Sequence, residues 1–304
     1  MRRAFPPTTL FLMMALAGGA ARAAVTEFTT SNVNVTSASA TGSISLSLSS
    51  LSTSNNNRLL VGVSIVRNTA PGSTPTVSSI TWNGTALTQV CSASETASTS
   101  NWVGMEIWAL QNPSASNSTV AITLSGSTVF QAGAVVFTNV ASLGTCVTQT
   151  HKGGDAVSST SVTVTAPGTG GAVFDTLAVE SIVSTSNFSM TATAGQTSLW
   201  NVPDTSNPPG GANCQSGGCS AGGAGSYAGN VSAMSYSFPG PSLSNTAYGA
   251  VPLIAAATPS KRKGQTIVGT LSQPSRPNKT GANGYRSKIT TRQQPDWFPD
   301  IWRT

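Results

Sequence analysis

Charge is scarce in this sequence. Only 8% of its 304 residues are charged, against about 25% in an average globular protein. Serine, threonine, glycine, alanine and valine take that place, and apolar residues alternate regularly with serine and threonine, which disordered segments do not show. The composition indicates a folded, neutral β protein.

Catalytic side chains are equally scarce. His151 is the only histidine, and it lies in a His-Lys-Gly-Gly-Asp segment typical of a solvated turn. A triad of His151, Asp155 and a serine would need supporting context, but no G-x-S-x-G motif is present. One histidine with scattered acids also supplies a zinc site poorly. We therefore predict no catalytic residue.

Long apolar runs are absent too. Leu10–Ala17 is apolar but too short to cross a bilayer. It follows Arg2 and Arg3 and precedes an A-x-A pattern at Ala21–Ala23, an arrangement typical of a secretory signal peptide. The sequence predicts a signal peptide over 1–23, cleavage after Ala23, no membrane span, and a secreted or cell-surface protein of a bacterium.

The net charge of +6 is unevenly distributed. Residues 24–258 hold three basic and seven acidic side chains, for a net charge of −4, whereas residues 259–304 hold nine basic and two acidic ones, for +7. An acidic body disfavours nucleic-acid binding. The basic tail, rich in proline and polar residues, is predicted to be disordered.

Short strand patterns fill residues 24–258. Ser43–Leu51 alternates with period two, Leu59–Val66 is a longer apolar run, and Asn83-Gly84 is a strong hairpin signal. No stretch has sustained helical periodicity. The predicted fold is an all-β, antiparallel β-sandwich of jelly-roll type in one domain.

The second half of this domain resembles the first. Leu59–Val66 matches Val173–Glu180 at an offset of 114, and Ala132–Phe137 matches Tyr248–Leu253 at an offset of 116. Two further pairs follow in the same order, so we predict pseudo-repeated halves at about 40–142 and 157–257. Convergent strand composition is the alternative.

Four segments carry a resemblance to a known class of protein: Asn57–Ser64, Ile80–Thr88, Glu106–Pro113 and Tyr248–Val251. They resemble secreted β-sandwich domains of bacterial extracellular and cell-surface proteins, of jelly-roll or lectin-like form. The resemblance covers about 25–257. It implies a fold and a location, and it supplies no catalytic residue because such domains mostly lack an assigned activity.

Two segments are predicted to be loops inserted between strands, namely Cys91–Asn101 and Asn201–Ser226. Cys214 and Cys219 lie five residues apart in the second one and are predicted to form a disulfide, which leaves Cys91 to pair with Cys146. Four cysteines allow three pairings. A metal site is disfavoured because no second ligand pair is near.

Calcium is the one cofactor that the sequence suggests. Asp155, Asp175 and Asp204 are the candidate ligands, because loop carboxylates of β-sandwiches often bind this ion. Asp175 lies inside an apolar strand, where an unpaired carboxylate is costly, so a backbone amide or hydroxyl partner is the alternative.

The tryptophans are the candidate ligand-binding residues. Strand alternation places Trp102, Glu106 and Trp108 on one face, as a platform for sugar rings, and Val103, Met105 and Ile107 on the other. Trp82, before a turn, and Trp200, beside the second predicted loop, are expected at exposed edges. Burial of these tryptophans in the core is the alternative.

Three functions follow from these features. The first is an exported adhesion or binding module that engages a polysaccharide or a cell-surface protein without catalysis. The second is a self-associating subunit of a surface layer or fibre. The third is an extracellular hydrolase acting on glycans or esters.

Overall fold

The computed structural model describes residues 22–53, 56–67, 75–98, 101–152, 157–181, 190–204, 220–238 and 245–258. Within these ranges the chain forms sixteen strands and no helix, and every strand pair is antiparallel. The predicted all-β antiparallel sandwich is confirmed. The described residues contain no helix that could cross a membrane. The predicted signal peptide and basic tail lie almost wholly outside the described residues.

The first half of the fold contains strands β1 to β7. Their bounds are β1 (Thr26–Ser47), β2 (Arg58–Arg67), β3 (Val77–Trp82), β4 (Thr85–Ala86), β5 (Thr88–Ser98), β6 (Asn101–Gln111) and β7 (Asn117–Thr138). They form one sheet of order β4-β3-β7-β2-β6-β5, with β1 also paired to β7. The β3–β4 hairpin turns at Asn83 and Gly84, both with positive φ, as the sequence predicts.

The second half contains strands β8 to β16. Their bounds are β8 (Val140–Leu143), β9 (Val147–His151), β10 (Ser159–Thr163), β11 (Ala172–Ser181), β12 (Thr191–Ala192), β13 (Thr197–Asp204), β14 (Ser220–Ala228), β15 (Ala233–Ser237) and β16 (Asn245–Ala255). One sheet has the order β13-β14-β11-β16-β8, with β9 also paired to β16, and a small sheet has the order β10-β15-β12.

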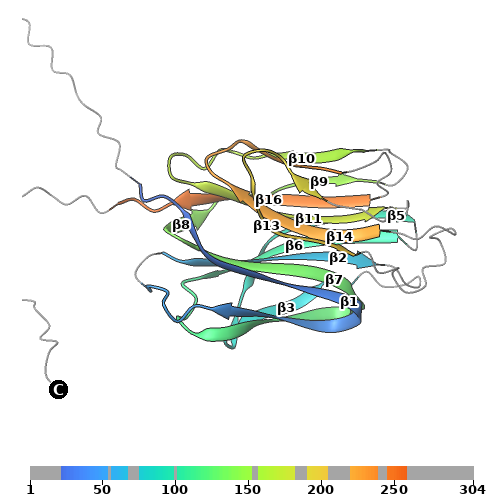
Figure 1. The fold of residues 1–304 in the computed structure, drawn as a ribbon, viewed down its shortest axis with the longest axis horizontal. Helices are drawn as coiled ribbons and strands as arrows, with labels where there is room; N and C mark the ends of the chain where they lie inside the picture. The colour runs from blue at the N-terminus through green and yellow to red at the C-terminus, as the bar shows by residue number, and fades with distance from the viewer. Residues whose placement is uncertain are drawn as a thin grey trace, which may run out of the picture. The chain divides into compact units, whose positions relative to one another are not determined.

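The strands lie in layers (Figure 1). Three hydrophobic cores hold them together. The first lies within the first half, where the long strand β7 pairs with β3 through its beginning and with β2 through its end, so that the sheet curls over Ile44, Val61 and Ile122. The third lies in the second half, around Leu177 and Tyr248. The second core packs the two halves against each other.

The two halves share one pattern of strand pairing. In the first, Val61 of β2 lies opposite Ala134 of β7 and Trp108 of β6. In the second, Asp175 of β11 lies opposite Ala250 of β16 and Ser226 of β14. The offset from Val61 to Asp175 is 114 and that from Ala134 to Ala250 is 116, the same values that align the sequences.

A bulge recurs at the matching place in both halves. The register shifts between Gln89 and Cys91 in β5, and between Ser198 and Trp200 in β13. The two register shifts lie 109 residues apart in the sequence. Bulges are specific features of a strand pair. Two bulges at matching places therefore support an internal repeat without relying on similar residue types.

The two predicted inserts are strand where the structure describes them, and residues 205–219 of the second lie outside the described residues. Cys91–Asn101 was expected to be a loop, but β5 continues through Ser98 as an edge strand paired with β6. In Asn201–Ser226, β13 extends to Asp204 and β14 begins at Ser220. Serine- and alanine-rich strands with a bulge lose clean alternation, so the sequence pattern does not show them.

A disulfide joins the halves. Cys91 in β5 is bonded to Cys146, which lies between β8 and β9. This confirms the predicted pairing of these two residues. The predicted Cys214–Cys219 bond lies outside the described residues.

We expect the double variant Cys91→Ser, Cys146→Ser to lose between about 2 and 4 kcal/mol in free energy of unfolding, because the bond closes a 55-residue segment. Urea unfolding of both proteins measures the difference. Reductant should lower the midpoint of the native protein more than that of the variant, and equal midpoints for the two proteins would show that packing alone holds these edges.

Candidate functional site

A groove of about 500 Å³ lies on the first half, over strands β5 and β6 and beside the start of β3. It is lined by Thr76, Val77, Gln89, Ser92, Ala93, Ser94, Trp102, Gly104, Met105, Glu106 and Trp108. Thr76, Gln89, Ser92 and Ser94 are exposed. The groove therefore combines indole rings with amide and hydroxyl groups, which is the mixture found in small-molecule sites of this size.

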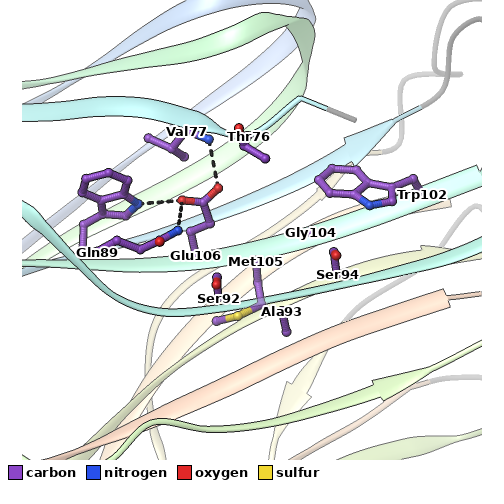
Figure 2. A pocket seen from close by; sticks show the side chains of 11 residues that line it. Thr76, Val77, Gln89, Ser92, Ala93, Ser94, Trp102, Gly104, Met105 and Glu106 are labelled. Carbon is purple, nitrogen blue, oxygen red and sulfur yellow. Dashed lines mark hydrogen bonds between the residues drawn. The ribbon is translucent and has the colours of Figure 1, made fainter. Parts of the chain in front are cut away.

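Glu106 lies at the centre of the groove and is only 5% exposed. Figure 2 shows its carboxylate between Val77 and Gln89. Its Oε1 accepts the Val77 backbone N–H at 2.9 Å, and its Oε2 accepts Gln89 Nε2 at 2.7 Å and Trp108 Nε1 at 2.8 Å. Three donors from three strands therefore fix this carboxylate in place.

The predicted alternation of β6 is confirmed. Trp102 and Trp108 pack against the core of the first half, whereas Val103, Met105 and Ile107 belong to the core between the halves. The structure thus brings Trp102, Glu106 and Trp108 together on one face, as the period-two pattern predicts.

The two groove tryptophans differ in exposure. Trp102 lies against Gly104, where a Cβ atom would overlap its ring, and it is only 5% exposed. It forms an end wall of the groove, and the expectation that it is an open platform is wrong. Trp108 is half-buried, so it is the aromatic ring that the groove presents.

The sequence pattern misses Gln89. Simple alternation in β5 places Gln89 on the face of Cys91, but the bulge between them shifts the register. Gln89, Ser92 and Ser94 consequently share the groove, while Cys91 belongs to the core between the halves. Only the pairing of Gln89 opposite Trp108 would have shown its role.

Trp82 and Trp200 do not lie at exposed edges, so that expectation is wrong. Trp82 is fully buried and donates from Nε1 to the Ser114 backbone oxygen at 3.2 Å. Trp200 is 3% exposed, and its ring occupies the space that Cβ atoms at Gly62, Gly133 and Gly225 would fill. Neighbouring turns in the sequence do not determine the depth of a side chain. Packing inside the first half buries Trp82, and packing against the first half buries Trp200.

Asp175 is fully buried among hydrogen-bond donors. Its oxygens accept the Ser226 N–H at 2.7 Å, the Tyr248 hydroxyl at 2.7 Å and the Tyr236 hydroxyl at 3.1 Å. The Ser226 hydroxyl and Gln196 Nε2 add two more donors. This bears out the backbone and hydroxyl partners considered for Asp175.

These donors do not fit calcium, which needs oxygen acceptors around it. The described residues hold no cluster of three or more metal-ligating side chains. Asp155 lies outside the described residues, and the side chain of Asp204 is not described. His151 is half-buried at the end of β9, opposite Thr246 of β16.

Burial raises the pKa of Asp175 to about 7, against hydrogen bonds from Tyr248, Ser226 and Tyr236 that lower it. Burial also raises the pKa of Glu180 to about 7, although a hydrogen bond from Asn245 lowers it. Burial and the nearby Asp175 raise the pKa values of Tyr236 and Tyr248, so both tyrosines remain protonated donors.

These shifts predict that stability falls as pH rises from about 4 to about 7. The folded carboxyl groups keep their protons in this window while the unfolded ones release them, so each contributes a slope on the order of −1.4 kcal/mol per pH unit. Urea unfolding at several pH values should show a shallower slope for Asp175→Asn. The exposed-strand variant Gln149→Ala is the control, and an unchanged slope in Asp175→Asn would contradict the assignment.

For Trp200→Ala we expect a loss of about 3–5 kcal/mol in the free energy of unfolding, as for other buried tryptophans. Trp108→Ala should cost clearly less, since Trp108 is half-buried. Thermal and urea unfolding compare the two variants, and a mild effect of Trp200→Ala would show that the halves pack without its ring.

Comparisons with known proteins add no relative. No protein-family description, curated protein or solved structure matches the chain.

Proposed function

We propose that this chain is an exported, non-catalytic binding module that holds a polysaccharide in the groove over β5 and β6. One observation carries the proposal: the half-buried Trp108 ring shares this groove with the polar side chains of Gln89, Ser92 and Ser94 and with a fixed carboxylate at Glu106.

Sugars suit this arrangement chemically. The apolar face of a sugar ring stacks on an indole, while its hydroxyl groups pair with amides, hydroxyls and carboxylates. Trp102 and Trp108 lie six residues apart on β6, or about 20 Å at 3.3 Å per residue. The groove therefore runs along β6 from the Trp108 ring to the wall at Trp102, and a short stretch of a polymer can lie in it.

Preorganisation supports binding at this place. Glu106 is held by hydrogen bonds from Val77, Gln89 and Trp108, so a ligand need not order its side chain. Fixed polar groups lower the entropic cost of binding. In the same way, the hydrogen bond from Trp108 to Glu106 orients the indole ring before a ligand arrives.

The groove favours binding over turnover. Glycoside hydrolysis typically uses a pair of carboxylates on either side of the bond, and Glu106 is the only acidic residue among those that line the groove. The Cys91–Cys146 bond is in keeping with an oxidising compartment, as the signal peptide predicts.

A second candidate function, a self-associating surface subunit, is favoured by one feature. Within the described residues, the edge strand β5 pairs only with β6. Free edge strands can pair with another chain. Concentration-dependent assembly in analytical ultracentrifugation, abolished by a proline at Ser94, would support this alternative.

We expect Trp108→Ala to weaken binding of a soluble oligosaccharide by about 2 kcal/mol, the value typical of an aromatic hot spot. Trp108→Phe should retain part of the affinity because it keeps an aromatic face. Screening on a glycan array selects the oligosaccharide, and titration calorimetry measures each affinity.

Gln89→Ala should weaken the same binding, whereas Gln149→Ala, a matched change on exposed strand β9, should not. If both glutamine variants and Trp108→Ala bind as tightly as the native chain, the groove is not the binding site.

A further inference from the structure

We infer that the groove selects a ligand bearing a positively charged amine. The polymer it binds is then a polysaccharide of amino sugars with free ammonium groups. This rests on the proposed function, because it concerns the same groove, and it names the chemical class of the ligand.

The charge of Glu106 is not neutralised within the described structure. Its three hydrogen-bond donors are a backbone amide, a glutamine amide and an indole, all of them uncharged. The other ten residues that line the groove are uncharged as well. A carboxylate that is only 5% exposed has lost most of its hydration, and an ion partner can compensate for that loss.

Glu106 also retains capacity for a further donor. A carboxylate offers about four acceptor positions, and Oε1 accepts one of the three hydrogen bonds while Oε2 accepts two. An ammonium group donates three hydrogen bonds and accepts none. It therefore suits the remaining position on Oε1 better than a hydroxyl does, since charge-assisted hydrogen bonds are stronger than neutral ones.

Trp108 adds to the preference for a cation. Its indole N–H points at Glu106, and its half-buried ring lines the same groove. The face of an indole attracts ammonium groups through its quadrupole. The Glu106 carboxylate and the Trp108 ring therefore both favour a cationic ligand. A neutral sugar gains only the stacking on the ring.

The part of the chain that forms the groove has the same sign of charge. Residues 24–258 carry a net charge of −4, although residues 259–304 carry +7, and an acidic body favours cationic polymers over uronates and phosphorylated polymers.

At the matching positions that the structure describes, the second half has no counterpart of this site. By strand pairing, Ala224 of β14 occupies the position of Glu106, because Ala224 lies opposite Leu177 as Glu106 lies opposite Val63. A Cβ atom at Gly222, which corresponds to Gly104, would contact Met190 instead of a tryptophan. One ligand-binding site per chain is therefore expected.

The test is titration calorimetry of the full chain at pH 5.5 with two probes of equal length, a glucosamine oligosaccharide with free amines and its fully N-acetylated form. We expect the free-amine oligosaccharide to bind at least tenfold more tightly, at one site per chain, with an affinity that falls as salt concentration rises. Methylammonium, which can donate the same hydrogen bonds to Glu106, should compete with it.

Glu106→Gln should abolish this preference while Glu95→Gln, a matched change in β5 outside the groove lining, should preserve it. Salt dependence and methylammonium competition use the native chain, so they test the inference even if Glu106→Gln fails to fold.

The outcomes separate the two proposals. Equal or tighter binding of the N-acetylated oligosaccharide at this groove overturns the amine preference and leaves polysaccharide binding intact. If the native chain binds neither probe, the amine inference fails, and failure across a glycan array as well removes the proposed function.

Discussion

The packing of one tryptophan against bare backbone holds the two halves of this protein together. Trp200 comes from β13 of the second half, and its ring lies where Cβ atoms at Gly62 and Gly133 of the first half would stand. Gly62 also faces Thr176, its counterpart in the second half. Because these glycines have no side chains, the central sheets approach closely enough to enclose the core between the halves.

The edge strands of the two halves are secured at matching places by different chemistry. Cys91 in β5 follows the bulge as Trp200 does in β13. In the first half a disulfide to Cys146 fixes the edge, whereas in the second half the buried indole does so. Each bulge turns the residue after it, Cys91 or Trp200, toward the opposing half. The same backbone geometry therefore positions a disulfide in one half and an indole in the other.

The halves differ where polar groups replace apolar ones. Val61 belongs to the core of the first half, but its counterpart Asp175 collects hydrogen bonds from Ser226, Tyr236 and Tyr248. In the first half the position of Ser226 is held by Trp108, whose indole donates to Glu106 at the groove. One half therefore buries its carboxylate under tyrosines, and the other holds one in the lining of the groove.

The sequence by itself determined the strand class, the Asn83-Gly84 hairpin and the two faces of β6, because each depends on neighbouring residues and on period-two alternation. Only the tertiary structure decided that Trp82 and Trp200 are buried and that Gln89 reaches Glu106. The physical reason is that burial depends on contacts between residues far apart in the chain, and a single bulge reverses the faces that alternation assigns.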